Sequence, residues 1–126
     1  MSKKYDIFLD CNKIGTTEFE KADVPMGVVF GILNFTEPIS GYAFFKQYCI
    51  EKSITIVAEF SEENIIETST IPGLVVINES GLQINGIGNQ ISGMDADVFF
   101  ITIYGISFPF YEEEFPLHVK AYNEKL

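Results

Sequence analysis

The stretch Asp97-Val98-Phe99-Phe100-Ile101-Thr102-Ile103-Tyr104 is the most strongly patterned part of the chain. Its β-branched and aromatic residues predict a strand, and Gly105 directly after it predicts a turn. We expect residues 106–110 to form a further strand at the edge of a sheet, because Pro109 cannot donate a ladder hydrogen bond. This region therefore indicates antiparallel β structure.

Several other segments read as strands. Residues 5–9 and 14–20 predict an N-terminal hairpin, since turn-forming residues separate them. Residues 28–35 predict a strand that is buried on both faces, with a bulge at Gly31. Weaker strand patterns are found at 54–60 and 65–71, and a hairpin is expected from 74–78 and 82–84.

Residues 40–52 are the best helix candidate. Ser40 can cap the first turn, and Tyr42, Phe45 and Cys49 recur at spacings of three and four residues. This aromatic stripe is more typical of a helix packed on a core than of a ligand site. The segment predicts one principal helix.

The fold class expected from this order of elements is α+β, mainly antiparallel sheet, with room for a short C-terminal helix after Pro116. The chain has 126 residues, of which 47% are hydrophobic. This length suits one domain with a real core, so we expect residues 1–126 to form a single domain.

Two short motifs resemble ligand loops without completing them. Residues 86–93, Gly-Ile-Gly-Asn-Gln-Ile-Ser-Gly, have the glycine content of a phosphate-binding loop. Ile91 stands where the dinucleotide pattern needs its third glycine, so we expect a turn-rich loop between strands. Residues 95–97, Asp-Ala-Asp, open like a calcium loop, but Phe99 and Phe100 stand where an EF-hand needs its third acid and the following glycine. A capping or surface role is expected there.

Charge is unevenly distributed along the sequence. All eight basic residues are lysine, against 18 acidic residues, and the formal net charge is −10. No basic residue occurs from 53 to 119, where ten of the acids lie. Nucleic acid and anionic membrane surfaces are disfavoured as partners because their recognition needs clustered Lys and Arg. The negative field favours a cationic partner, although simple solubility is an equally good reading.

An acidic run among aromatics, residues 111–115, is the candidate binding feature. Aromatic anchors beside carboxylates suit a basic protein partner, whereas acids on an edge strand can instead prevent aggregation. The predicted partner-binding residues are Tyr111, Glu112, Glu113, Glu114, Phe115, Asp95, Asp97, Glu62 and Glu63.

Catalytic and cofactor signatures are weak. His118 is the single histidine, and no neighbouring motif orients it for catalysis or metal binding. Cys11 and Cys49 are too far apart for a CxxC site, so two reduced thiols are expected. We therefore expect no enzyme, no metal and no cofactor. With no apolar secretory segment near the N-terminus, a cytoplasmic location is expected.

Segments across most of the chain resemble a family of small acidic bacterial proteins. The resemblance rests on residues 5–10, 13–18, 26–31, 86–90 and 111–116, and it covers no mechanistic motif. Some members are similar to immunity proteins of contact-dependent growth inhibition systems. The resemblance implies a tight one-to-one complex with a cognate toxin domain, often a basic nuclease, in the cytoplasm of the producing cell. It identifies no binding residue.

The leading hypothesis is an immunity-type protein that blocks the basic active site of a toxin with an acidic face. The alternative is a β-rich small-molecule-binding or minor enzymatic domain with an aromatic-lined pocket, which a deep cavity with convergent polar groups would favour. A third reading is a structural subunit that associates with itself through the Pro109 edge.

Overall fold

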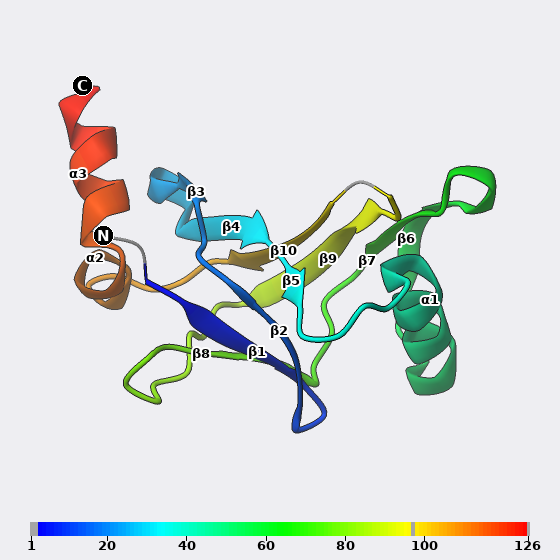
Figure 1. The fold of residues 1–126 in the computed structure, drawn as a ribbon. Helices are drawn as coiled ribbons and strands as arrows, with labels where there is room; N and C mark the ends of the chain where they lie inside the picture. The colour runs from blue at the N-terminus through cyan, green and yellow to red at the C-terminus, as the bar shows by residue number, and fades with distance from the viewer. Residues whose placement is uncertain (1–2, 97, 126) are drawn as a thin grey trace.

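The computed structural model describes residues 3–96 and 98–125, and these residues form two antiparallel sheets and three α-helices (Figure 1). The four-stranded sheet has the order β5-β2-β1-β8. Its strands are β1 (Tyr5–Leu9), β2 (Asn12–Thr17), β5 (Asn34–Phe35) and β8 (Leu74–Ile77).

The six-stranded sheet has the order β3-β4-β10-β9-β7-β6. Its strands are β3 (Lys21–Asp23), β4 (Val28–Ile32), β6 (Ile56–Phe60), β7 (Ile65–Thr68), β9 (Gly88–Met94) and β10 (Phe99–Tyr104). The α+β class with mainly antiparallel strands is confirmed. The helices are α1 (Gly41–Lys52), α2 (Phe110–Glu114) and α3 (Pro116–Glu124), with short 3-10 turns η1 (Val24–Met26) and η2 (Ser61–Glu63).

The main core lies between the two sheets. Alternate residues of β1 are buried, as the two-residue period of a half-buried strand requires. Facing them, the buried residues of β10 come from every second position in the same way. The resulting apolar layer includes Tyr5, Ile7, Leu9, Phe99, Ile101 and Ile103.

The chain crosses between the sheets at Phe19 and at Leu33. The predicted strand 28–35 is consequently two strands, β4 in one sheet and β5 in the other. Leu33 between them donates its backbone N–H to the carbonyl of Phe99 at 2.8 Å. Burial alternates along β4, so the expectation of two buried faces is wrong. Gly31 pairs with Ile101 in an unshifted register, and the expected bulge is absent there.

Helix α1 closes one end of the sandwich, at the right of Figure 1. The predicted helix is confirmed, with Ser40 as its N-cap accepting from the N–H of Ala43. Phe45 is fully buried and lies 6.2 Å from the ring of Phe35 and 6.0 Å from the ring of Phe99. Because those two rings belong to different sheets, Phe45 ties both sheets to the helix.

Helices α2 and α3 close the opposite end (Figure 1). Residues 106–110 form no edge strand, contrary to expectation. Tyr111 donates its N–H to the carbonyl of Ser107 and Glu113 donates its N–H to the carbonyl of Pro109, so this segment is a turn that leads into α2 at Phe110. The short helix after Pro116 is confirmed as α3. Within the described residues, none of the helices combines the length and the apolar character that a membrane span needs.

Residues 86–93 are not a loop: most of them form β9, a central strand between β10 and β7. Ile91 pairs with Ile101, and both are fully buried. The glycines that made this segment look like a turn are needed because other backbone comes close. A Cβ on Gly93, within β9, would lie 2.4 Å from the carbonyl oxygen of Val98, and a Cβ on Gly86, just before the strand, would lie 2.1 Å from that of Tyr104. Tight packing therefore overrides the low strand propensity of glycine.

The remaining strand predictions hold in part. The N-terminal hairpin forms as β1 and β2 in antiparallel register. The segments 54–60 and 65–71 contain the hairpin of β6 and β7. The expected hairpin of 74–78 and 82–84 is reduced to β8 and a single bridge between Ile77 and Gln83.

Candidate functional site

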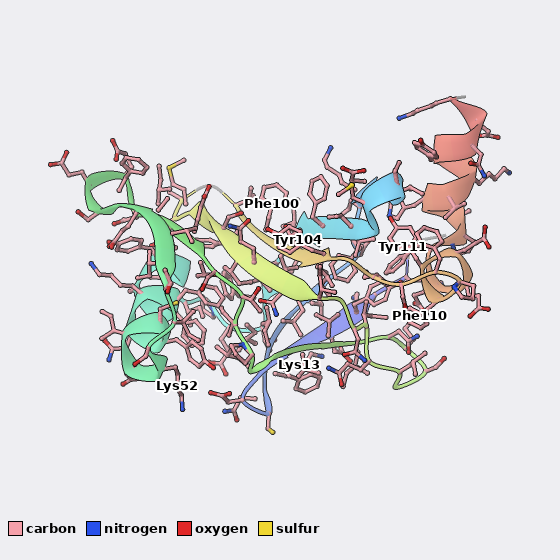
Figure 2. All side chains as sticks on the ribbon, turned by 180° about the vertical axis from the view of Figure 1, so that it is seen from behind. Lys13, Lys52, Phe100, Tyr104, Phe110 and Tyr111 are labelled. Carbon is pink, nitrogen blue, oxygen red and sulfur yellow. The ribbon has the colours of Figure 1, made fainter. Side chains whose placement is uncertain are left out.

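One face of the six-stranded sheet turns away from the core. Residues paired across neighbouring strands point to the same face, and successive residues point to opposite faces. The pair Ile101 and Ile91 is buried, so the next pair along β10 and β4, Phe100 with Ile32, points outward. In Figure 2, Phe100 and Tyr104 lie along the upper side of the sheet, away from Lys13 and Lys52 on the lower part of the molecule.

A row of apolar side chains crosses the outward side of this sheet near its end. Ile65 pairs with Met94 on one side and with Phe60 on the other. Phe60 is 58% exposed and Ile32 is 37% exposed. Side chains of this kind lose water when a partner covers them, which makes them candidate anchors. We define the open face as Phe30, Ile32, Phe60, Ile65, Met94 and Phe100.

Carboxylates surround one end of the open face. Glu62 and Glu63 lie on the turn between β6 and β7. The N–H of Asp95 donates to the carbonyl of Asn64 at 3.3 Å. The turn that follows β9 therefore lies beside the turn between β6 and β7. Glu67 lies on the open side of β7, opposite Ser92. We define the acidic rim as Glu62, Glu63, Glu67 and Asp95.

No ion pair involves the acidic rim within residues 3–96 and 98–125. The four ion pairs found there join Lys3 to Glu114, Lys13 to Asp6, Lys46 to Glu59 and Lys52 to Asp10. The rim charges are therefore not compensated by a nearby lysine of this chain. Three of the predicted binding residues, Glu62, Glu63 and Asp95, are thus brought together, whereas Asp97 lies outside the described residues.

Asp95 also has a structural task. Its carboxylate accepts hydrogen bonds from the hydroxyl of Ser40 and from the N–H of Tyr42, the latter at 3.0 Å. It therefore satisfies a free donor at the N-terminus of α1, where a negative charge is also favoured by the helix dipole. This is the capping role that the sequence suggested.

We expect Asp95→Ala to lower the free energy of unfolding by about 1–2 kcal/mol, the usual cost of losing a helix cap. Glu62→Ala is the matched control, because Glu62 is exposed and accepts no described hydrogen bond. It should change stability by less than about 0.5 kcal/mol. Urea unfolding followed by far-ultraviolet circular dichroism measures both, and equal stabilities of the two variants would contradict the capping role.

The acidic run 111–115 is helical, and helical spacing divides it. Tyr111 is 0% exposed, Phe115 is 5% exposed and Glu114 is 8% exposed, while Glu112 and Glu113 face solvent. Positions 111, 114 and 115 share one helix face, which packs inward. Tyr111, Glu114 and Phe115 are therefore part of the interior and not exposed anchors. The run also lies at the end of the molecule opposite to the acidic rim (Figure 1).

Glu114 is the centre of a buried polar network. Its carboxylate accepts from the hydroxyl of Tyr5 and from the side-chain amide of Asn78, each at 2.9 Å. The ammonium of Lys3 lies 3.6 Å from the same carboxylate and donates to the Glu114 carbonyl at 2.7 Å. Burial, and then the hydrogen bond to Glu114, raise the pKa of Tyr5 far above its ordinary range.

A cavity of about 390 Å³ opens beside this network. This volume is within the range of small-molecule sites. The wall is part aromatic, from Phe19 and Phe115, and part charged. His118 also lines the cavity. A ring nitrogen of His118 lies 2.7 Å from the carbonyl oxygen of Phe19, so a ring N–H can donate a hydrogen bond to that carbonyl. That contact orients His118 toward the backbone and gives it a structural partner.

A third polar cluster lies between α1 and β6. Lys46 and Glu59 form an ion pair at 2.7 Å, and Tyr42 donates to the same carboxylate. The hydrogen bond from Lys46 lowers the pKa of Glu59, and that to Glu59 raises the pKa of Lys46. Both shifts favour the charged pair, so neither group is prepared to act as a base or an acid near neutral pH.

Metal ligands do not gather in the described residues: no group of three or more His, Cys, Asp or Glu side chains is placed to hold an ion. Cys11 is exposed and Cys49 is buried, and both are free thiols. Burial raises the pKa of the Cys49 thiol, which makes it less reactive.

The chain matches no protein-family model, and comparisons with curated proteins and with solved structures find no significant match either. The family resemblance of its segments therefore stays a prediction.

The open face was missed by sequence reasoning, although a signal was present. Strand β10 carries apolar or aromatic residues at nearly every position, which is typical of a strand covered on both sides. The structure covers one side only. An uncovered side on such a strand indicates a surface that a partner can cover.

Proposed function

We propose that this chain is an immunity-type protein that binds and neutralises a cognate, basic toxin domain. The observation that carries the proposal is the open face, an apolar row flanked by carboxylates that have no lysine partner in the described chain. Apolar anchors supply affinity and the acidic rim supplies attraction to a basic surface. A nuclease-type toxin domain, basic because it binds phosphate, has the complementary chemistry.

The competing readings differ in what the structure offers them. The small-molecule alternative is favoured by the cavity beside Glu114, which has both aromatic and charged walls. Self-association through an edge strand at Pro109 lacks its strand, since residues 106–109 form an irregular turn that leads into α2 at Phe110. The open face combines exposed apolar side chains with carboxylates that form no ion pair among the described residues, and this combination supports protein binding.

The first experiment is capture of the protein domain encoded immediately upstream, with elution by rising salt. We expect a basic partner that loses its toxic activity when this chain is bound. If that domain neither binds nor changes its activity at low salt, the immunity proposal fails. A thermal-shift screen of small molecules would then test the alternative.

We expect the double variant Glu62→Lys, Glu63→Lys to slow association with the partner by about tenfold at low salt, because it reverses charge where the partner docks. Stopped-flow measurement at several salt concentrations checks this, and the salt dependence should flatten.

The matched control is Glu112→Lys, Glu113→Lys, which changes the net charge equally at the opposite end of the molecule. At about 0.1 M ionic strength, where screening weakens charges farther than about 10 Å from the interface, its association rate should fall by less than about threefold. A larger effect from the α2 pair than from the rim pair would place the interface at α2 instead.

A further inference from the structure

Beside the Glu114 network, the cavity holds an ammonium group of the chain itself. Lys3 lines the cavity, and its Nζ lies 3.6 Å from the Glu114 carboxylate and 2.7 Å from the Glu114 carbonyl oxygen. We propose that this cavity is a binding site for an alkylammonium group from outside the chain, and that Lys3 is an internal ligand which such a group displaces. The proposal does not depend on toxin binding.

The anionic end of the site is fixed in advance. The side chain of Glu114 is 9% exposed, and the hydrogen bonds from Tyr5 and Asn78 hold both of its oxygens in place. These donors are neutral, so they orient the carboxylate without cancelling its charge. A preorganised carboxylate in a partly desolvated position attracts a cation more strongly than an exposed one does.

Lys3 is loosely held by comparison. Its side chain is 45% exposed, and the ammonium is closer to the carbonyl oxygen than to the carboxylate. Ion pairs with an exposed partner contribute little to stability. An incoming ammonium can therefore take the place of Lys3 while Glu114 keeps its other two hydrogen bonds.

The rest of the cavity suits the carbon part of an amine. Phe115 is buried with its ring 5.7 Å from that of Tyr5 and 6.0 Å from that of Phe19. Leu117 is 61% exposed and forms an apolar lip. Aromatic faces and aliphatic side chains bury apolar groups, and aromatic faces also attract cations.

The balance of charge selects for cations. Among the described residues, three carboxylates line the cavity, those of Glu18, Glu20 and Glu114, against one ammonium, that of Lys3. Glu20 also accepts from the N–H of Ile32 at 2.9 Å, which holds its carboxylate in place. Carboxylate or phosphate ligands would meet repulsion here, whereas a primary amine with a small apolar body fits both the charge and the volume.

The test uses benzylamine as the probe, followed by NMR of the whole protein, with benzyl alcohol as the uncharged control. We expect saturable shifts at Tyr5, Phe115 and His118 with the amine and weaker binding of the alcohol. Lys3→Met should bind benzylamine about fivefold more tightly than the unmodified protein, since it removes a half-exposed competing ion pair.

Lys4→Met is the matched control, because Lys4 is the exposed neighbour and makes no ion pair among the described residues. It should bind as the unmodified protein does. The proposal is overturned if benzyl alcohol binds as tightly as benzylamine, if no shifts saturate, or if Lys3→Met binds no better than Lys4→Met.

A second arm separates the two sources of such a group. N-acetyl-lysine methylamide presents the side chain as a protein partner would, and its Nε-acetylated form removes the charge. Binding of the lysine derivative at the same residues, lost on acetylation, indicates that a lysine side chain can occupy the site. Binding of benzylamine alone assigns the site to small free amines.

Discussion

Replacing Glu114 with alanine is expected to lower the free energy of unfolding by about 3 kcal/mol, a large part of the stability of a domain of this size. The carboxylate joins Tyr5 of β1, Asn78 after β8 and Lys3, so it connects α2 to the four-stranded sheet. Without it, the buried hydroxyl of Tyr5 loses the acceptor that it uses in the fold. Urea unfolding at neutral pH measures the loss.

Two variants separate the network from other causes. Glu114→Gln keeps the volume of the side chain but removes its charge and one of its two acceptor oxygens. It should therefore still lower the free energy of unfolding by about 2 kcal/mol, through lost hydrogen bonding. Glu113→Ala changes the exposed neighbour on the same helix and should cost less than about 0.5 kcal/mol. If Glu114→Ala were no more costly than Glu113→Ala, the network would have no net role in stability.

Local signals in the sequence were sufficient for the elements that fold by local rules. The helix at 40–52 has its cap, its apolar spacing and its polar side in one segment, and Ser40 and Phe45 act as those signals indicate. The N-terminal hairpin likewise has turn residues between two alternating strands. In both cases the residues that decide the structure are close in sequence.

The failures occurred where distant residues decide. From its glycines, the segment 86–93 looks like a loop. Only the fold shows that the backbone of Tyr104 and Val98 packs closely against these glycines. Strands β4 and β5 look like one strand because the sequence does not show that the chain changes sheets at Leu33. Tertiary contacts determine both features, and strand propensity depends strongly on such context.

The sequence predicted the net negative charge of the surface but not where on the fold that charge lies. Charge counts along the sequence identified an acidic half, yet Lys3 and Lys46 from the other half reach across to neutralise Glu114 and Glu59. The carboxylates of the acidic rim remain unpaired in the described chain. Whether an acid attracts a partner depends on its spatial neighbours, and only the fold supplies those.

Stability is expected to fall steeply above pH 10, because two buried tyrosines resist ionisation in the fold. Burial raises the pKa of Tyr111 to about 12, with Asp23 adding to the shift, and raises that of Tyr5 still further. In the unfolded chain a tyrosine loses its proton near pH 10. Above that pH the unfolded state binds fewer protons than the native state, so the free energy of unfolding decreases as pH rises.

For each such tyrosine the slope approaches about 1.4 kcal/mol per pH unit, which amounts to about 4 kcal/mol for both between pH 9 and pH 11.5. The stabilisation is fully present below pH 10 and is lost as the pH approaches the native pKa. Urea unfolding at half-unit steps from pH 8 to pH 11.5 gives the slope.

Tyr111→Phe should lower stability by about 1 kcal/mol at pH 8, since the bond from its hydroxyl to the Val28 carbonyl is lost. Above pH 10 the free energy of unfolding of this variant should fall less steeply, by about 1.4 kcal/mol per pH unit, because the Tyr111 phenol no longer contributes. An unchanged slope in Tyr111→Phe would show that groups other than this buried tyrosine cause the alkaline loss.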